Sequence, residues 1–155
     1  MKGDPRLIQA VTEALQPIVT FHEVSKVFRR VAKRYRYKKL RKWFAKSADM
    51  SGEWRWCLEG MLAKWGSPVS IDLNAATIDT KAPWEVYLAD QATRGTEIRD
   101  LLKTAYDIAE AVENNTAASE LCDLQEECEC MLARLEAFAR QMTDQGIENW
   151  LSEKM

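Results

Sequence analysis

The sequence predicts an all-α protein in which four long helices form a bundle. Through most of the chain, apolar residues recur three and four positions apart, which is the spacing of one helical face. The 6 Gly and 4 Pro are few, and most of them fall at the ends of these periodic segments. A segment of about fifteen residues, 67–81, lacks the pattern, and its length suits a long crossover between the second and third helices. We expect one domain over residues 1–155.

The first helix is predicted to begin at Asp4-Pro5, because an acidic capping residue precedes a proline at the first helical position. It should end between residues 34 and 37. Pro17 should kink it or remove one backbone hydrogen bond. The apolar spacing predicts an inward face formed by Leu7, Ile8, Val11, Leu15, Ile18, Val19, His22, Val27 and Val31.

The second helix is predicted to begin near Lys38 and to stop at Gly66, which Ser67-Pro68 follows. Its predicted inward face consists of Leu40, Trp43, Phe44, Ser51, Trp54, Leu58, Met61, Leu62 and Trp65. The third helix should start at 82–84 and end before a turn at 114–116. Its predicted inward face consists of Tyr87, Gln91, Arg94, Ile98, Leu101, Ala105, Ile108 and Val112.

The fourth helix is predicted over residues 117–143, and a short fifth helix over residues 147–151. Between them, Asp144-Gln145-Gly146 is a stop signal. The apolar spacing predicts an inward face on the fourth helix formed by Leu121, Leu124, Cys128, Met131, Leu132 and Leu135.

The net charge of −2 conceals a strongly basic segment. Between Lys26 and Lys46 the chain has eleven Lys or Arg and no acidic residue. The simplest interpretation is a solvated helix face. Alternatives are a contact with an acidic neighbouring subunit or with a polyanion, nucleic acid being the less favoured example. The basic surface is predicted to include Arg29, Arg30, Lys33, Arg34, Arg36, Lys38, Lys39, Arg41 and Lys42.

No apolar run approaches the roughly 20 residues of a membrane-spanning helix. The first residues lead directly into an amphipathic helix, so we expect no signal peptide and a cytoplasmic location. The cysteines Cys57, Cys122, Cys128 and Cys130 then predict reduced thiols. Cys57 and Cys128 are best interpreted as small buried hydrophobic residues, with copper(I) binding as a weaker alternative. Cys128 and Cys130 point about 200° apart on a helix, so they are poorly placed to share one ion.

Both ends of the chain carry short residue patterns that are informative. Met1-Lys2-Gly3-Asp4 opens the chain, and the run 146–151 reads Gly-Ile-Glu-Asn-Trp-Leu. With Leu40, Gly66 and Ala89-Asp90 between them, these residues resemble the bacterioferritin branch of the ferritin-like family. The resemblance implies a four-helix bundle with a long crossover and a short fifth helix. It also implies a cage of 24 subunits that oxidises Fe(II), stores ferric mineral and binds haem between paired subunits.

The positions that match the family's iron ligands carry other residues here. Read by helical phase, they are Ile18, Ser51, Trp54, Arg94, Cys128 and Met131. A shift of one residue gives Met50 and Glu53 in the second helix, or Glu127 and Cys130 in the fourth. The chain has 1 His, whereas the family's site needs two. We therefore expect no di-iron centre. The haem-ligand methionine falls on Gly52 or Ser51, so we expect haem to be absent or only weakly bound.

Two polar residues on the predicted inward faces need partners. A buried guanidinium is costly when unpaired, so we expect Arg94 to form a salt bridge with Glu127, the first choice, or Glu53. Removing Arg94 should then lower the melting temperature. His22 is best interpreted as a hydrogen-bonded core histidine, in preference to a metal ligand.

The leading interpretation is a bacterioferritin-like cage subunit that takes part in iron storage without its own ferroxidase centre. The cage, homomeric or mixed with an active subunit, would hold ferric mineral. The alternative is a four-helix binding module whose segment Lys26–Lys46 holds a polyanion or a partner protein. A redox thiol at Cys128 or Cys130 ranks third, because it lacks a nearby histidine. The sequence leaves open which ion is stored.

Overall fold

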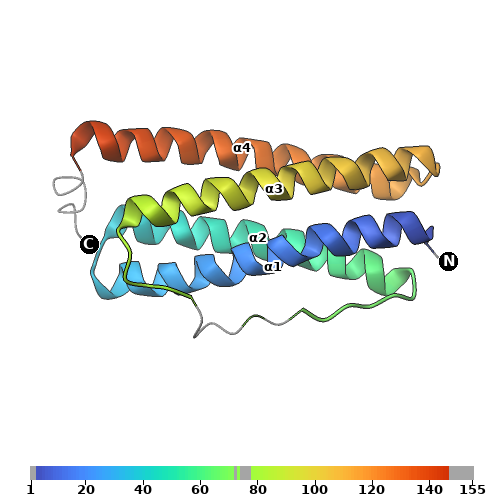
Figure 1. Cartoon of the computed structure of the whole chain (residues 1–155), viewed down its shortest axis with the longest axis horizontal. Coiled ribbons are helices and arrows are strands. Elements are labelled where there is room, and N and C mark those ends of the chain that lie inside the picture. Colours follow the sequence, from blue (N-terminus) through green and yellow to red (C-terminus); the bar gives the residue numbers. More distant parts are fainter. Residues whose placement is uncertain (1–2, 72, 74–77, 147–155) are drawn as a thin grey trace.

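The computed structural model describes residues 3–71, 73 and 78–146. Its elements are four α-helices: α1 (Pro5–Arg34), α2 (Lys38–Lys64), α3 (Trp84–Ala111) and α4 (Asn115–Gln145). They lie side by side along their lengths (Figure 1). The predicted all-α four-helix bundle is therefore confirmed. The predicted fifth helix, 147–151, and the family-like opening at Met1-Lys2 lie outside the described residues.

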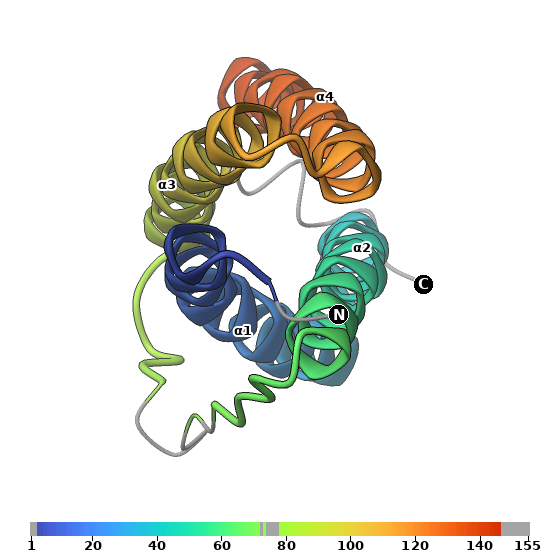
Figure 2. The ribbon, with the colours of Figure 1, turned by 90° about the vertical axis from the view of Figure 1, so that its right-hand side faces the viewer.

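The helices surround a common core, as the view along the bundle shows (Figure 2). Backbone packing is closest between α1 and α2, then between α3 and α4, and α1 also packs on α3. The seam between α2 and α4 has much less close backbone packing. Helix α2 ends, and α3 begins, at opposite ends of the bundle (Figure 1). No helix in the described part of the chain is long and apolar enough to cross a membrane.

The helix boundaries follow from their caps. The Asp4 side chain accepts a hydrogen bond from the Arg6 backbone N–H at 2.8 Å, and Pro5 is the first residue of α1. The α1–α2 turn needs a left-handed residue, Arg36, with a φ of 60°. Helix α4 begins earlier than predicted because Asn114 caps it, accepting from the Ala117 backbone N–H at 3.1 Å. Helix α1 continues through Pro17.

The buried faces of α1, α2 and α4 largely match the prediction. The predicted face of α3 is shifted in its middle: Gly95 is buried, whereas Arg94 is about one third exposed. Both residues satisfy the helical spacing, since Arg94 follows Gln91 by three positions and Gly95 follows it by four. Glycine adds no side chain to an apolar pattern, so the sequence did not distinguish them.

Gly95 is buried because α3 and α4 approach closely there. A Cβ atom at this position would lie 2.8 Å from Leu132 Cδ2 and 3.1 Å from Met131 Cε. The Cys128 thiol also contacts the Gly95 carbonyl oxygen, with an Sγ–O distance of 3.3 Å. A residue without a side chain is therefore needed for the observed packing of the two helices.

We expect Gly95→Val to lower the free energy of unfolding by about 1–3 kcal/mol, because extra atoms in a close-packed core force neighbouring side chains to move. Gly60→Val is the matched control. A Cβ at Gly60, an exposed position in α2, would have no other atom within 4 Å. The control should be neutral or slightly stabilising, since valine favours helix more than glycine does. Urea denaturation measures both. Equal effects of the two substitutions would contradict the close approach at Gly95.

Candidate functional site

The residues at the family's ligand positions are mostly buried in the middle of the bundle. Ile18, Ser51, Trp54 and Cys128 are fully buried, and Met131 is nearly so. All of these except Ser51 belong to one hydrophobic cluster. The Ser51 hydroxyl donates to the Ser47 carbonyl oxygen of its own helix at 2.6 Å. The structure therefore brings the predicted residues from α1, α2 and α4 into one apolar core.

Trp54 makes both an aromatic contact and a hydrogen bond to other helices in this region. Its ring lies 6.3 Å from that of Phe21 in α1, measured between centroids. Its indole N–H donates to Glu127 Oε2 in α4 at 2.8 Å. An indole nitrogen only donates hydrogen bonds and offers no lone pair to a metal ion. Trp54 thus occupies the core as an apolar ring, and its N–H binds Glu127, one of the two glutamates that the sequence offered as alternatives.

A second tryptophan joins the four helices. The Trp43 indole N–H donates to Gln91 Oε1 at 2.7 Å, and the Gln91 amide donates to Ser25 Oγ at 3.5 Å. The Trp43 ring also stacks on Phe138 of α4, with a centroid distance of 4.8 Å and an interplanar angle of 20°. The sequence placed Gln91 inward but gave it no partner. A buried amide requires hydrogen bonds, so the inward position of Gln91 could have predicted that it has polar partners.

The structure pairs Arg94 with a residue that was not predicted. Arg94 Nε lies 2.7 Å from Asp90 Oδ2, one turn earlier in α3, and both side chains are more than a third exposed. The predicted partners are elsewhere: Glu127 accepts from Trp54, and Glu53 is exposed. An exposed pair within one helix contributes only about 0.3–0.5 kcal/mol. The predicted salt bridge of Arg94 with Glu127 or Glu53 is therefore wrong, and the observed pair gives no reason to expect a large loss of stability when Arg94 is removed.

His22 differs from its prediction in one respect. It is partly buried in α1, but its Nδ1 atom is buried without a hydrogen-bond partner in the described part of the chain. On its other side, a Cβ at Gly52 would lie 3.1 Å from His22 Nε2. Burial lowers the pKa of His22 below its ordinary value, and the charge of Lys26 adds to the effect.

The four cysteines have different environments. Cys128 is buried, Cys57 and Cys122 are partly buried, and Cys130 is exposed. Burial raises the pKa of the Cys128 thiol to about 12. Burial, with the nearby Glu120 carboxylate, raises the pKa of Cys57 to about 11. The protonated thiol is a weak nucleophile, so this environment favours an inert packing role for Cys128.

The predicted basic surface gathers at the end of the bundle where α1 turns into α2. A hollow of about 310 Å³ is lined by Lys26, Arg29, Arg30 and Lys33 of α1, with Arg41 of α2. The four α1 residues follow the spacing i, i+3, i+4 and i+7, which places them on one helical face. Tyr35, 58% exposed, stacks on Tyr37 in the adjoining turn.

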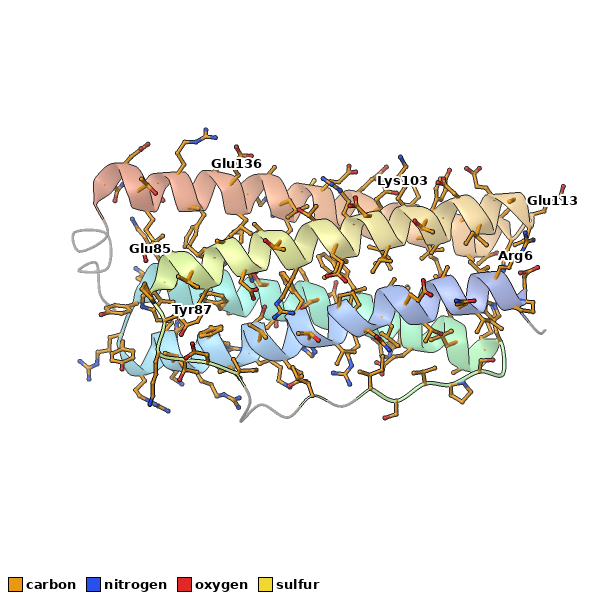
Figure 3. The ribbon with its side chains drawn as sticks, in the orientation of Figure 1. Arg6, Glu85, Tyr87, Lys103, Glu113 and Glu136 are labelled. Atoms are coloured by element: carbon orange, nitrogen blue, oxygen red, sulfur yellow. The ribbon has the colours of Figure 1, made fainter. Side chains whose placement is uncertain are left out.

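Aromatic rings form the interior beneath this end of the bundle. The Phe28 ring of α1 lies 3.9 Å from the ring of Tyr87, measured between centroids, and Trp84 packs edge-on to both. Tyr87 extends from the first turns of α3 into this end of the molecule (Figure 3). Its hydroxyl accepts from the Ala82 backbone N–H at 2.7 Å. The end of the bundle that carries the basic residues therefore has a well-packed aromatic interior.

Among the described residues, no three His, Cys, Asp or Glu side chains are grouped so that they could hold a metal ion. A scan against models of known protein families finds no match, and a search of the curated proteins finds none either.

We expect Glu127→Ala to lower the free energy of unfolding by about 1–3 kcal/mol, because the buried Trp54 N–H loses its charged acceptor. Glu97→Ala is the matched control, since Glu97 is an exposed glutamate in the middle of α3. It should change stability by less than about 0.5 kcal/mol. Thermal and urea denaturation give both values. A Glu127 variant as stable as the control would mean that the Trp54 contact contributes little.

Thiol reactivity should follow burial. With iodoacetamide at pH 8, we expect Cys130 to be alkylated first. Cys128 should stay unmodified until the chain unfolds, because its raised pKa keeps it protonated far above pH 8 and the core shields it. Peptide mass spectrometry of samples taken with and without urea identifies the modified residue. Alkylation of native Cys128 as fast as that of Cys130 would contradict the buried position.

Proposed function

We propose that this chain is a bacterioferritin-like cage subunit that supports iron storage as a wall component, without its own ferroxidase centre. The support is the four-helix bundle together with one observation: Trp54 fills its centre and binds Glu127. A ferritin-like iron site requires several inward carboxylates and imidazoles. Here the corresponding positions carry Ile18, Cys128, Met131 and the Trp54 indole in the core, with a Ser51 hydroxyl bonded to its own helix and a partly exposed Arg94.

The proposal includes the rest of the family topology. The connection between α2 and α3 would be the long crossover, since these helices end and begin at opposite ends of the bundle (Figure 1). Shell contacts use the outer surfaces of the helices. Such contacts are independent of the residues at the bundle centre. The cage would then be homomeric, or mixed with an active subunit that supplies iron oxidation.

A second candidate function has its own observation. The hollow lined by five cations favours a four-helix module that holds a polyanion. This function does not require a cage, so particle size separates it from the leading proposal.

The test of the cage is light scattering coupled to size-exclusion chromatography. We expect a particle near 24 times the 17.8 kDa chain mass, for the chain alone or after co-expression with an active bacterioferritin subunit. The particle formed by the chain alone should oxidise Fe(II) no faster than buffer and show no haem Soret band. An active bacterioferritin measured in parallel is the positive control.

A monomer or dimer under both conditions would reject the cage. Rapid oxidation of two irons per subunit by the chain alone would reject the absence of a ferroxidase centre, and a strong Soret band with a bis-methionine spectrum would reject the absence of haem.

A further inference from the structure

The hollow at the α1–α2 end has an unusual lining. Lys26, Arg29, Arg30, Lys33 and Arg41 converge on it, and Lys and Arg side chains carry only hydrogen-bond donors. Among the described residues, no carboxylate, amide or hydroxyl side chain lines the hollow. A ligand that matches this lining must therefore present acceptors alone. This requirement disfavours nucleobases, sugars and peptides inside the hollow itself, because each also brings N–H or O–H donors that would find no side-chain acceptor there, whereas a group attached to the ligand can lie outside it.

Local charges leave the hollow with a large positive excess. In the part of the chain that the structure describes, the lining forms an ion pair with Glu23, whose Oε1 lies 3.3 Å from Lys26 Nζ. The same carboxylate oxygen also lies 3.2 Å from a guanidinium nitrogen of Arg55, so its charge is shared. Within residues 3–71, 73 and 78–146, this carboxylate neutralises at most one of the five lining charges. A compact ligand with several negative charges would complement the remainder.

We propose that this hollow binds an oligophosphate chain, either inorganic or carried by a nucleotide. Phosphate oxygens are acceptors, and three guanidinium groups provide the forked donors that match them. The hollow, at about 310 Å³, is compact, and its cations converge instead of extending along a track. An extended nucleic-acid strand would need such a track and stacking surfaces along it. The described residues that line the hollow include no aromatic side chain.

The inference deepens the second candidate function and does not rest on the cage. Isothermal titration calorimetry of the full chain at about 0.15 M salt, where distant surface charges are screened, is the test. Tripolyphosphate, ATP, AMP and inorganic phosphate are the probes. We expect tripolyphosphate and ATP to bind, and AMP and phosphate to bind at least about tenfold more weakly, because they place fewer charges in the hollow. Equal binding of tripolyphosphate and ATP indicates recognition of the phosphate chain alone, and tighter ATP binding indicates a nucleotide.

Substitutions assign the site. The double variant Arg30→Gln/Arg41→Gln removes one guanidinium from each helix and should weaken tripolyphosphate binding by about tenfold or more. The control Lys103→Gln/Arg134→Gln removes two charges from exposed positions on α3 and α4, and should change the affinity by less than about twofold. Lys103 extends from the side of the bundle away from the α1–α2 turn (Figure 3). Melting curves of all variants check that each is folded.

Two results would overturn the proposal: no binding of tripolyphosphate and ATP, or equal weakening of tripolyphosphate binding by the two double variants. Light scattering on the same samples separates this result from the cage. A monomer that binds tripolyphosphate rejects the cage only, and a 24-subunit particle that does not bind it rejects this site only.

Discussion

Two indole rings from α2 hold the seam between α2 and α4, where the helix backbones are least closely packed. Trp54 binds Glu127 through its N–H, and Trp43 stacks on Phe138. Large rings span a gap that aliphatic side chains would leave partly empty, and empty space in a core is costly. These two residues therefore supply direct side-chain contacts between α2 and α4, while α4 also packs on α3.

The same arrangement limits what the bundle centre can do chemically. An ion site needs space and several inward acceptors, whereas here the space is taken by Trp54 and its acceptor Glu127 is already engaged. Cys128, the most buried thiol, is kept protonated by its surroundings, which raise its pKa. Packing that stabilises the helices thus favours an inert centre, and any binding chemistry is expected on the surface.

The faces of α1, α2 and α4 were predictable because their apolar side chains repeat with helical spacing. The middle of α3 was not, because Arg94 and Gly95 fit the spacing equally well and only the close approach of α4 selects glycine. Side-chain contacts between different helices could not be predicted from the sequence either. The contact between Trp54 and Glu127 joins residues 73 positions apart, and it depends on how far each helix is rotated and shifted along its axis.

Repulsion between cations at the α1–α2 end of the bundle costs stability, and this cost bears on the function of that end. Lys33 and Arg34 suit the last turn of α1, where cations interact favourably with the helix dipole. At the start of α2 the opposite holds: Lys38 and Lys39 occupy a first turn that has no acidic residue, and the Tyr37 cap makes no side-chain hydrogen bond. Cations there repel one another and the positive end of the dipole. A polyanion bound as we propose would offset this repulsion.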